Sequence, residues 1–315
     1  MSSWGAVARP RIRLGYHQVK PAGTFVKKEL PATVVSAYYE MPSKYPKENY
    51  RKWVRLFLET VDCWLVFFCE KELVPFIEDC RKAYPEKTTI VILPREHWIA
   101  NKAFPQTFWQ DQHTIDPEKS IHSPDLYKVW FEKKEFVKKA IRLNPYGHTD
   151  FVWTDAGFCR SEGFATLIRQ YPNADRIPTN KFLMLNVGEF TEKDNDVVNI
   201  NSVPLRGGGH GKMRIGGTIL AASRDIWLQY NEAYDRALLK FDMAKLFCGK
   251  DQSIMATLVL ENPGLISLVE PKPIGPELWF YLGLWLGCSE KLYGVLNDKV
   301  RQGQKRTYEE LKLIA

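Results

Sequence analysis

Uninterrupted apolar runs, separated by amphipathic segments, constrain the fold more than any other feature of this sequence. Runs such as 33–39 and 63–69 are rich in β-branched and aromatic residues, which favours strands, whereas segments such as 50–60 have the apolar spacing of a helix. Strands that are apolar throughout are typical of parallel sheets covered by helices on both faces. The predicted strands are 33–39, 63–69, 88–93, 151–154, 181–187, 215–223 and 265–269, and the predicted helices are 50–60, 73–84, 124–143, 224–247 and 249–260.

This alternation predicts an α/β fold with a mostly parallel central sheet and helices on both faces. With 315 residues, 45% of them apolar, the chain can bury one full hydrophobic core. We expect an N-terminal extension over residues 1–30, one catalytic domain over 31–275, and an aromatic, helical extension over 276–315 that packs on this domain. Residues 101–123 are expected to form a polar, aromatic-bearing loop.

Charge and composition limit the partners that the chain could bind. The formal net charge of +7 would attract an anionic ligand such as a diphosphate, but the basic residues are spread over helices and do not indicate nucleic acid. The six cysteines form no CxxC pair and several lie in apolar runs, which favours buried free thiols in a reducing compartment. No apolar run reaches the ~20 residues of a spanning helix. We therefore expect a soluble, cytoplasmic protein that could associate with a membrane surface, and the oligomeric state stays open.

Two aspartates are the candidate catalytic residues. In an open α/β sheet, ligands bind outside the carboxyl ends of the strands, which is where Asp155 follows the predicted strand. Its carboxylate could hold a divalent cation on a diphosphate, or it could cap the next segment. Asp251, in preference to Asp235, could accept the proton of an acceptor hydroxyl, although it too stands where a helix is capped.

A glycine-rich basic segment is the candidate phosphate site. Within 206–214, backbone N–H groups and the side chains of His210, Lys212 and Arg214 could surround phosphate oxygens, although a surface loop would have the same composition. The segment does not match the GxxxxGK[ST] pattern of nucleotidases. The following pair Gly216 and Gly217 interrupts a strand, which indicates either the close approach of a ligand or simple packing.

Taken together, these segments resemble the HtrL/YibB (WlaTC/HtrL) family of GT-A-like glycosyltransferases. The resemblance covers roughly residues 33–269. It rests on the segments Val35-Ser36-Ala37-Tyr38-Tyr39, Tyr50-Arg51-Lys52-Trp53, Leu126-Tyr127-Lys128-Val129-Trp130 with Lys134, Asn144-Pro145, Phe151-Val152-Trp153-Thr154-Asp155-Ala156-Gly157, 206–223 and Lys250-Asp251-Gln252.

The resemblance implies a GT-A-like fold and a role for each of these segments. It implies Asp155 and Asp251 as catalytic residues and, at the acceptor, Gly216, Gly217 and Gln252. It implies that the donor is bound by Ala37, Tyr38, Tyr39, Lys134, Trp153, Thr154, Gly157, His210, Lys212 and Arg214. For Lys134, a solvated helix face is the other interpretation. Many GT-A enzymes hold manganese or magnesium with Asp-x-Asp, but this chain has one carboxylate in that motif, so His210 would be the second ligand or cations would replace the metal.

The predicted activity is transfer of a hexose or pentose from a nucleotide-diphosphate sugar to a hydroxyl of a glycan, lipid or protein. Two other functions stay open. A nucleotidyltransferase would make the nucleotide sugar, but it usually has a glycine-rich loop after its first strand, where this chain has Glu40-Met41-Pro42-Ser43-Lys44. A non-catalytic carbohydrate-binding protein on the same fold would use the ten tryptophans and fourteen tyrosines for stacking on sugars.

Overall fold

The chain folds around one seven-stranded sheet, in the strand order β3-β2-β1-β4-β6-β5-β7. The computed structural model describes residues 23–105, 107–190, 194, 213–271, 278–297 and 311–313. Strand β6 pairs antiparallel with β4 and β5, and all other pairs are parallel, so six strands run in one direction. The strands are β1 (Thr33–Tyr38), β2 (Trp64–Cys69), β3 (Thr88–Ile92), β4 (Asp150–Thr154), β5 (Phe182–Asn186), β6 (Ile215–Ser223) and β7 (Ile266–Val269).

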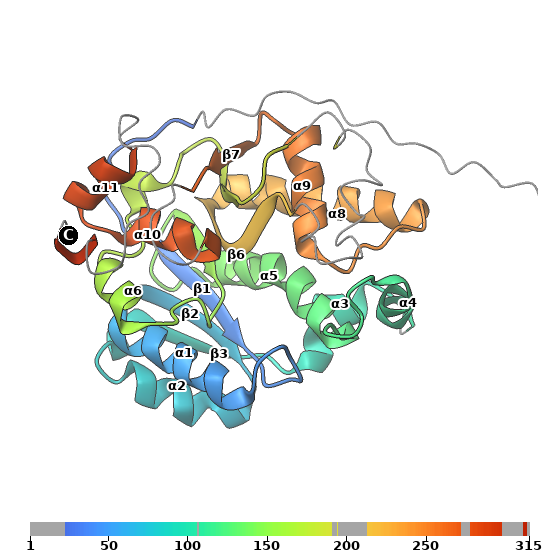
Figure 1. The fold of residues 1–315 in the computed structure, drawn as a ribbon. Helices are drawn as coiled ribbons and strands as arrows, with labels where there is room; N and C mark the ends of the chain where they lie inside the picture. Colours follow the sequence, from blue (N-terminus) through green and yellow to red (C-terminus); the bar gives the residue numbers. More distant parts are fainter. Residues whose placement is uncertain are drawn as a thin grey trace, which may run out of the picture.

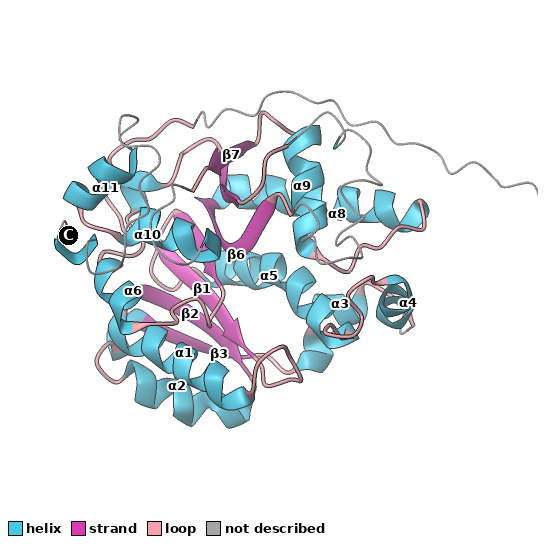
Figure 2. Cartoon of the chain, viewed as in Figure 1, coloured by secondary structure: helices cyan, strands magenta, loops and turns pink. Residues whose placement is uncertain are grey.

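Helices cover both faces of this sheet (Figures 1 and 2). One layer contains α5, α8 and α9, and the opposite layer contains α1, α2, α6, α10 and α11. The helices are α1 (Lys47–Thr60), α2 (Val74–Arg81), α3 (Ile99–Lys102), α4 (Phe108–Ile115), α5 (Pro124–Leu143), α6 (Glu162–Leu167), α8 (Arg224–Met243), α9 (Asp251–Glu261), α10 (Tyr281–Gly287) and α11 (Glu290–Asn297). The predicted α/β class, the mostly parallel sheet and its two helical layers are confirmed.

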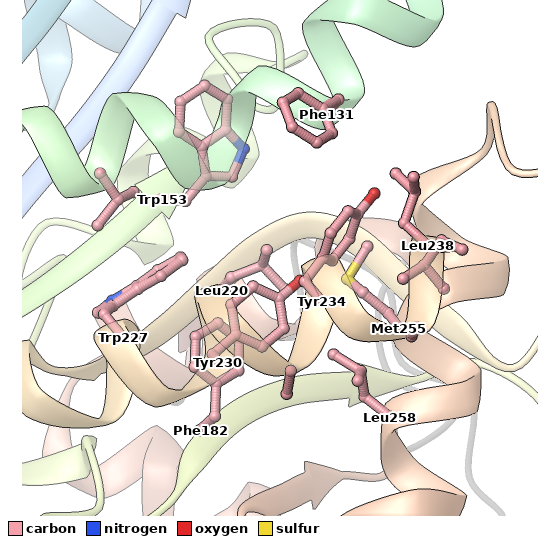
Figure 3. Close-up of a cluster of buried hydrophobic side chains, with 14 of the residues drawn as sticks. Phe131, Trp153, Phe182, Leu220, Trp227, Tyr230, Tyr234, Leu238, Met255 and Leu258 are labelled. Carbon is pink, nitrogen blue, oxygen red and sulfur yellow. The ribbon is translucent and has the colours of Figure 1, made fainter. Parts of the chain in front are cut away.

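The continuous apolar strands are explained by two separate hydrophobic cores. Successive side chains of a strand point to opposite faces, so Val35 of β1 enters the core under α5 and α8 whereas Val34 enters the core under α1 and α6. Figure 3 shows part of the first core, where Phe182 stacks on Tyr230 with 3.9 Å between ring centroids. Because both faces are covered, most side chains of both sets are apolar, and the buried hydroxyl of Ser36 donates to the carbonyl oxygen of Thr154.

The segment between β3 and α5 differs from its prediction. Residues 101–123 were expected to form a loop, but the segment contains the end of α3 and all of α4. Phe108, Trp109 and Gln112 are buried on one side of α4, with the i, i+1, i+4 spacing of a short helix against a core. The prediction was wrong because the two-turn apolar pattern is too short to stand out among polar residues.

Helix α5 has the boundaries that its sequence predicts. The Ser123 hydroxyl accepts a hydrogen bond from the backbone N–H of Leu126, and Pro124 occupies the first turn, where its missing N–H costs nothing. Asn144 ends the helix in the left-handed conformation with φ 34°. These two ends fix the register of α5, and therefore which of its side chains reach the sheet.

Segments near both ends of the described chain pack on the domain. Lys28 forms an ion pair with the buried Asp150 at 3.0 Å, and the ring of Phe25 lies 6.3 Å from that of Trp285 in α10. Leu282 and Leu286 of α10 are fully buried. Of the residues described, no helix is both long and apolar enough to cross a membrane.

Substitution of Gly287 by alanine is expected to destabilise the protein by about 1–3 kcal/mol through overpacking. A Cβ atom at this position would lie 2.7 Å from the Cβ of Tyr171 and 3.1 Å from the carbonyl oxygen of Ile168, neither of which can move away as a flexible side chain could. Chemical denaturation of the variant measures the effect. Gly264→Ala is the control, because a Cβ there meets nothing within 4 Å. Equal stability of the two variants would contradict this packing.

Candidate functional site

A large cleft opens at the carboxyl ends of β1 and β4, where ligands bind in open α/β sheets. Its volume is about 1010 Å³, which is at the upper end of the range for small-molecule sites. The walls come from the segment after β1, the first half of α5, the segment after β4, and Trp279 and Phe280. The lining residues are Ala37–Lys47, Tyr50, Ile121, His122, Leu126, Val129, Trp130, Lys133, Trp153, Asp155–Gly157, Arg160, Thr218, Trp279 and Phe280.

An ion triad of two aspartates and one lysine lies at this cleft. The Nζ atom of Lys133 is 3.2 Å from Oδ1 of Asp155 and 3.0 Å from Oδ2 of Asp251. It also donates a hydrogen bond to the carbonyl oxygen of Gly217 at 2.9 Å. The triad therefore connects α5, the end of β4, β6 and the start of α9 at one point.

Asp155 is the carboxylate of the triad that a ligand can reach. Its side chain is 37% exposed, and its Oδ1 atom also accepts a hydrogen bond from Nε1 of Trp153 at 2.8 Å. Enclosure at the cleft raises the pKa of Asp155, and the charge of Asp251 adds to this, while Lys133 and Trp153 oppose it. The carboxylate is thus held in one orientation by two donors and faces the cleft.

Asp251 lies behind the cleft lining and is almost fully buried. Within the described part of the chain its Oδ2 atom accepts no hydrogen bond, although the ammonium of Lys133 lies 3.0 Å away. It approaches β6 closely because Gly217 has no side chain: a Cβ there would lie 3.0 Å from Oδ2 of Asp251 and 2.9 Å from Cε of Met255. Gly217 therefore makes room for the carboxylate rather than for a ligand in this arrangement.

The charge of Lys133 depends on these two carboxylates. Burial alone would lower the pKa of Lys133, but Asp155 and Asp251 together raise it above its ordinary value. The ammonium is therefore charged at neutral pH. Lys133 therefore places a positive charge between the two aspartates.

A second cation borders the cleft without a carboxylate partner. Among the described residues Arg160 forms no ion pair, and its guanidinium lies 4.4 Å from the ring centroid of Trp53, 4.9 Å from that of Phe280 and 5.4 Å from that of Tyr45. Cation–π contacts hold the guanidinium in place, and its Nε–H donates to the carbonyl oxygen of Gly157 at 3.4 Å. Its two terminal NH2 groups donate no hydrogen bond within the described part of the chain, so they can bind an anion.

Several of the residues predicted from sequence meet at this cleft. Those that line it are Ala37, Tyr38, Tyr39, Trp153, Asp155 and Gly157. The hydroxyl of Tyr39 donates to the carbonyl oxygen of Leu93 at 2.8 Å, so its ring is fixed. Strand β1 and the end of β4 are neighbours in the sheet, which is why segments more than a hundred residues apart reach one cleft.

Other predicted residues lie away from the cleft. Lys134 points to α8, where its Nζ atom is 2.9 Å from Asp235 and donates to Asn231 at 3.2 Å. The hydroxyl of Thr154 pairs with that of Tyr171 inside the core. Arg214 forms a buried ion pair with Asp194 at 2.8 Å, Gly216 packs against Leu185 and Val187, and Gln252 is outside the cleft lining. His210 and Lys212 lie outside the described residues.

Lys133, Arg160 and His122 line the cleft but were not predicted from the sequence. Lys133 and Lys134 are adjacent in a charged helix, so charge gave no reason to prefer Lys133. The spacing of Trp130 and Lys133 could have identified Lys133, because residues three apart lie on the same face of a helix.

The described residues alone do not fit a divalent cation. Magnesium and manganese need several oxygen ligands, but Oδ1 of Asp155 already accepts from Trp153 and pairs with Lys133. Glu40, which also lines the cleft, pairs with Lys47 and Arg51. In the described part of the chain no three His, Cys, Asp or Glu side chains come together as a metal group.

Comparison with known proteins gives similarity to solved structures only. No family model matches the chain, and no curated protein matches it. One similar structure is the apo form of mouse xyloside xylosyltransferase 1, with 9% identity over 82% of this chain and 95% of that chain and a TM-score of 0.45. Another is core-mannan synthase A from Aspergillus fumigatus in an Mn/GDP form, with 13% identity over 83% of this chain and 78% of that chain and a TM-score of 0.42.

Proposed function

We propose that the chain is a glycosyltransferase that takes a sugar from a nucleotide-diphosphate donor and transfers it to a hydroxyl group. The observation that carries the proposal is the reachable carboxylate of Asp155, held by Trp153 and Lys133 in a cleft of about 1010 Å³ at the carboxyl ends of the strands. The cleft combines aromatic rings with cations, which suits a ligand that has flat rings and a charged diphosphate. The GT-A-like assignment and membership of the HtrL/YibB family belong to this proposal, as does a cytoplasmic location.

Each wall of the cleft has a role in this proposal. The backbone and rings of Ala37, Tyr38 and Tyr39 border the nucleotide. Arg160 faces the diphosphate, because its guanidinium has no carboxylate to neutralise it among the described residues. Asp155 orients the sugar, and Lys133 favours the ionised form of its carboxylate and holds it in place.

The reaction needs stabilisation of the negative charge on the leaving diphosphate. The bond between the anomeric carbon and the diphosphate oxygen breaks, and its electron pair stays on that oxygen. A fixed cation at this position stabilises the transition state more than the ground state, because charge develops there during bond breaking. Arg160 is already held by three rings, so it loses little freedom when it binds.

A thermal-shift screen with UDP, GDP, CDP, CMP and ADP, each with and without manganese, tests this proposal. One nucleoside diphosphate is expected to raise the melting temperature selectively, because a ligand at a hundred times its Kd stabilises a protein by about 2.7 kcal/mol. In Asp155→Ala the shift is expected to be smaller. Glu162→Ala, seven residues away at the start of α6 and outside the cleft lining, is the matched control.

Two further assays distinguish the other candidate functions. Pyrophosphate release from a nucleoside triphosphate and a sugar phosphate would indicate the nucleotidyltransferase. Glycan binding without any nucleotide response would indicate the carbohydrate-binding protein. Either result would overturn the transferase proposal, and dependence of the shift on manganese would show that the nucleotide binds together with the cation.

A further inference from the structure

One face of α5 forms an apolar wall of the cleft. Leu126, Val129, Trp130 and Lys133 all line it, at positions i, i+3, i+4 and i+7 of the helix, and side chains with this spacing lie on one face. The row is about 10 Å long, because a helix rises about 1.5 Å per residue. Its first three members are apolar and are called the α5 stripe below, and its last member, Lys133, belongs to the ion triad with Asp155.

The α5 stripe is supported from behind by the protein core. Val129 and Trp130 are partly buried and pack against the core between α5 and the sheet. The ring of His122 contacts that of Trp130 edge-on with 5.0 Å between centroids, and the ring of Tyr127 lies 6.0 Å from it. These contacts restrict the Trp130 ring, so the stripe keeps its shape without a ligand. A surface that is already ordered loses little entropy when it binds.

The charged side chains of the cleft lie mostly on its other walls. On α5, Lys133 is the one charged residue at the cleft, and its ammonium is already paired with Asp155 and Asp251. A diphosphate therefore belongs at the other walls, and the α5 stripe suits an uncharged part of a substrate. The charged residues that line the other walls are Glu40, Lys44, Lys47, Asp155 and Arg160.

The α5 stripe also has few hydrogen-bonding groups beside it. The polar side chains next to it in the cleft are Lys133 and His122, and Nδ1 of His122 lies 2.8 Å from Oδ2 of Asp116. A peptide or an oligosaccharide on the stripe would lose water from its polar groups without gaining partners, which costs free energy. An alkyl chain has no such groups, and its burial is favourable in proportion to its apolar area.

Ile121 extends this apolar wall beyond the start of α5. It lines the same cleft, and its side chain is 50% exposed. With the α5 stripe it forms an apolar path between an exposed residue and the ion triad, and an apolar patch that lines a cleft is typical of a binding surface. A chain-shaped ligand can follow this path over its full length, whereas a single flat ring would cover a part of it.

We propose that the α5 stripe binds an alkyl chain of the acceptor, so that the acceptor is a molecule of the glycolipid type, with a sugar joined directly to the chain. This rests on the proposed function and names the acceptor class for it. The chain lies along Leu126, Val129 and Trp130, and the acceptor sugar lies at the Lys133 end of the row, next to Asp155. The donor occupies the walls that carry the other charged groups.

The experiment measures by calorimetry the affinity of methyl, hexyl and phenyl β-glycosides of glucose, galactose, mannose and xylose. Each is measured with and without the nucleoside diphosphate that the thermal-shift screen selects. The proteins are wild type, Leu126→Asn, Val129→Thr and Leu143→Asn. Val129→Thr keeps the shape of the side chain, so it tests the stripe without opening a cavity. Leu143→Asn is the matched control, because Leu143 lies on the same helix and is 55% exposed but does not line the cleft.

In wild type, a hexyl glycoside is expected to bind about a hundredfold more tightly than the methyl glycoside of the same sugar. Burial of about three to four CH2 groups has this effect, because each contributes about fourfold. The ratio should fall about tenfold in Leu126→Asn and less in Val129→Thr, and Leu143→Asn should keep the wild-type ratio. The affinity for the nucleoside diphosphate should be the same in all four proteins.

The outcomes separate this proposal from the proposed function. Equal affinity of hexyl and methyl glycosides in nucleotide-bound wild type would overturn the role of the stripe alone. So would equal losses in Leu143→Asn and Leu126→Asn, displacement of the nucleotide by hexyl glycosides, or tight binding of phenyl but not hexyl glycosides. A wild-type dimer in sedimentation that Leu126→Asn abolishes would mean that a second copy covers the stripe, which also overturns the proposal. If wild type binds no nucleoside diphosphate, the proposed function fails and the acceptor role fails with it.

Discussion

Replacement of Lys133 by methionine is expected to lower the free energy of unfolding by about 3–5 kcal/mol, the cost of breaking a buried ion pair by removing one partner. The ammonium of Lys133 is the only cation within 4 Å of Asp155 and Asp251 among the described residues. Without it, Asp251 becomes an uncompensated buried charge, and the carbonyl oxygen of Gly217 loses its donor. Urea denaturation followed by circular dichroism measures the change.

Two further variants show whether the loss comes from the ion triad. Lys138→Met changes the same type of residue in the same helix, but its ammonium is partly exposed and 4.0 Å from Glu135, so a change within about 0.5 kcal/mol is expected. Adding Asp251→Asn to Lys133→Met removes the uncompensated charge and should recover part of the loss. A Lys133→Met protein as stable as Lys138→Met would contradict the importance of the triad.

The pH dependence of this stabilisation follows from the pKa of Lys133. Since the folded-state pKa is raised, the native protein binds this proton more tightly than the unfolded chain does. The contribution is therefore fully present at neutral pH and is lost only as the pH rises through and above the ordinary range of lysine. Lys133→Met should lack this alkaline loss.

Hydropathy alone was sufficient to predict the strands and half of the described helices, namely α1, α2, α5, α8 and α9. Buried strands such as β2 are apolar on both faces because each face packs in one of the two cores. The continuous apolar run in the sequence is therefore a direct result of burial and identifies the strand. The order of the strands in the sheet could not be predicted in this way. The antiparallel insertion of β6 between β4 and β5 depends on pairing between segments far apart in the chain, which no local pattern encodes.

The site was predictable only in part, for a related physical reason. Asp155 follows a strand directly, so the general rule for α/β sheets points to it. Lys133 and His122 reach the cleft only because α5 has a particular rotation on the sheet, set by core side chains such as Phe136 and by the two ends of the helix. A shift of one residue would have placed Lys134 there, and its actual partners are Glu135 and Asp235.

The two aspartates of the triad are expected to differ in what their substitution removes. Asp155→Asn should reduce the rate of sugar transfer about 10²- to 10³-fold, the size seen when one preorganised polar contact to a reacting group is lost. Its stability should change little, because the side chain is 37% exposed and water can replace lost contacts. Enzyme kinetics and urea denaturation on the same preparations measure both effects.

Asp251→Asn should instead cost stability, about 1–3 kcal/mol, because Asp251 is buried beside Lys133 and the close packing at Gly217 leaves no room for water. Its effect on transfer would then come through the position of Lys133 and Asp155 rather than through contact with the sugar. The Asp251→Asn enzyme should therefore keep nucleotide affinity and lose turnover only moderately. If Asp251→Asn lost as much turnover as Asp155→Asn with unchanged stability, Asp251 would have to reach the substrate directly, and the acceptor would enter from the side of α9.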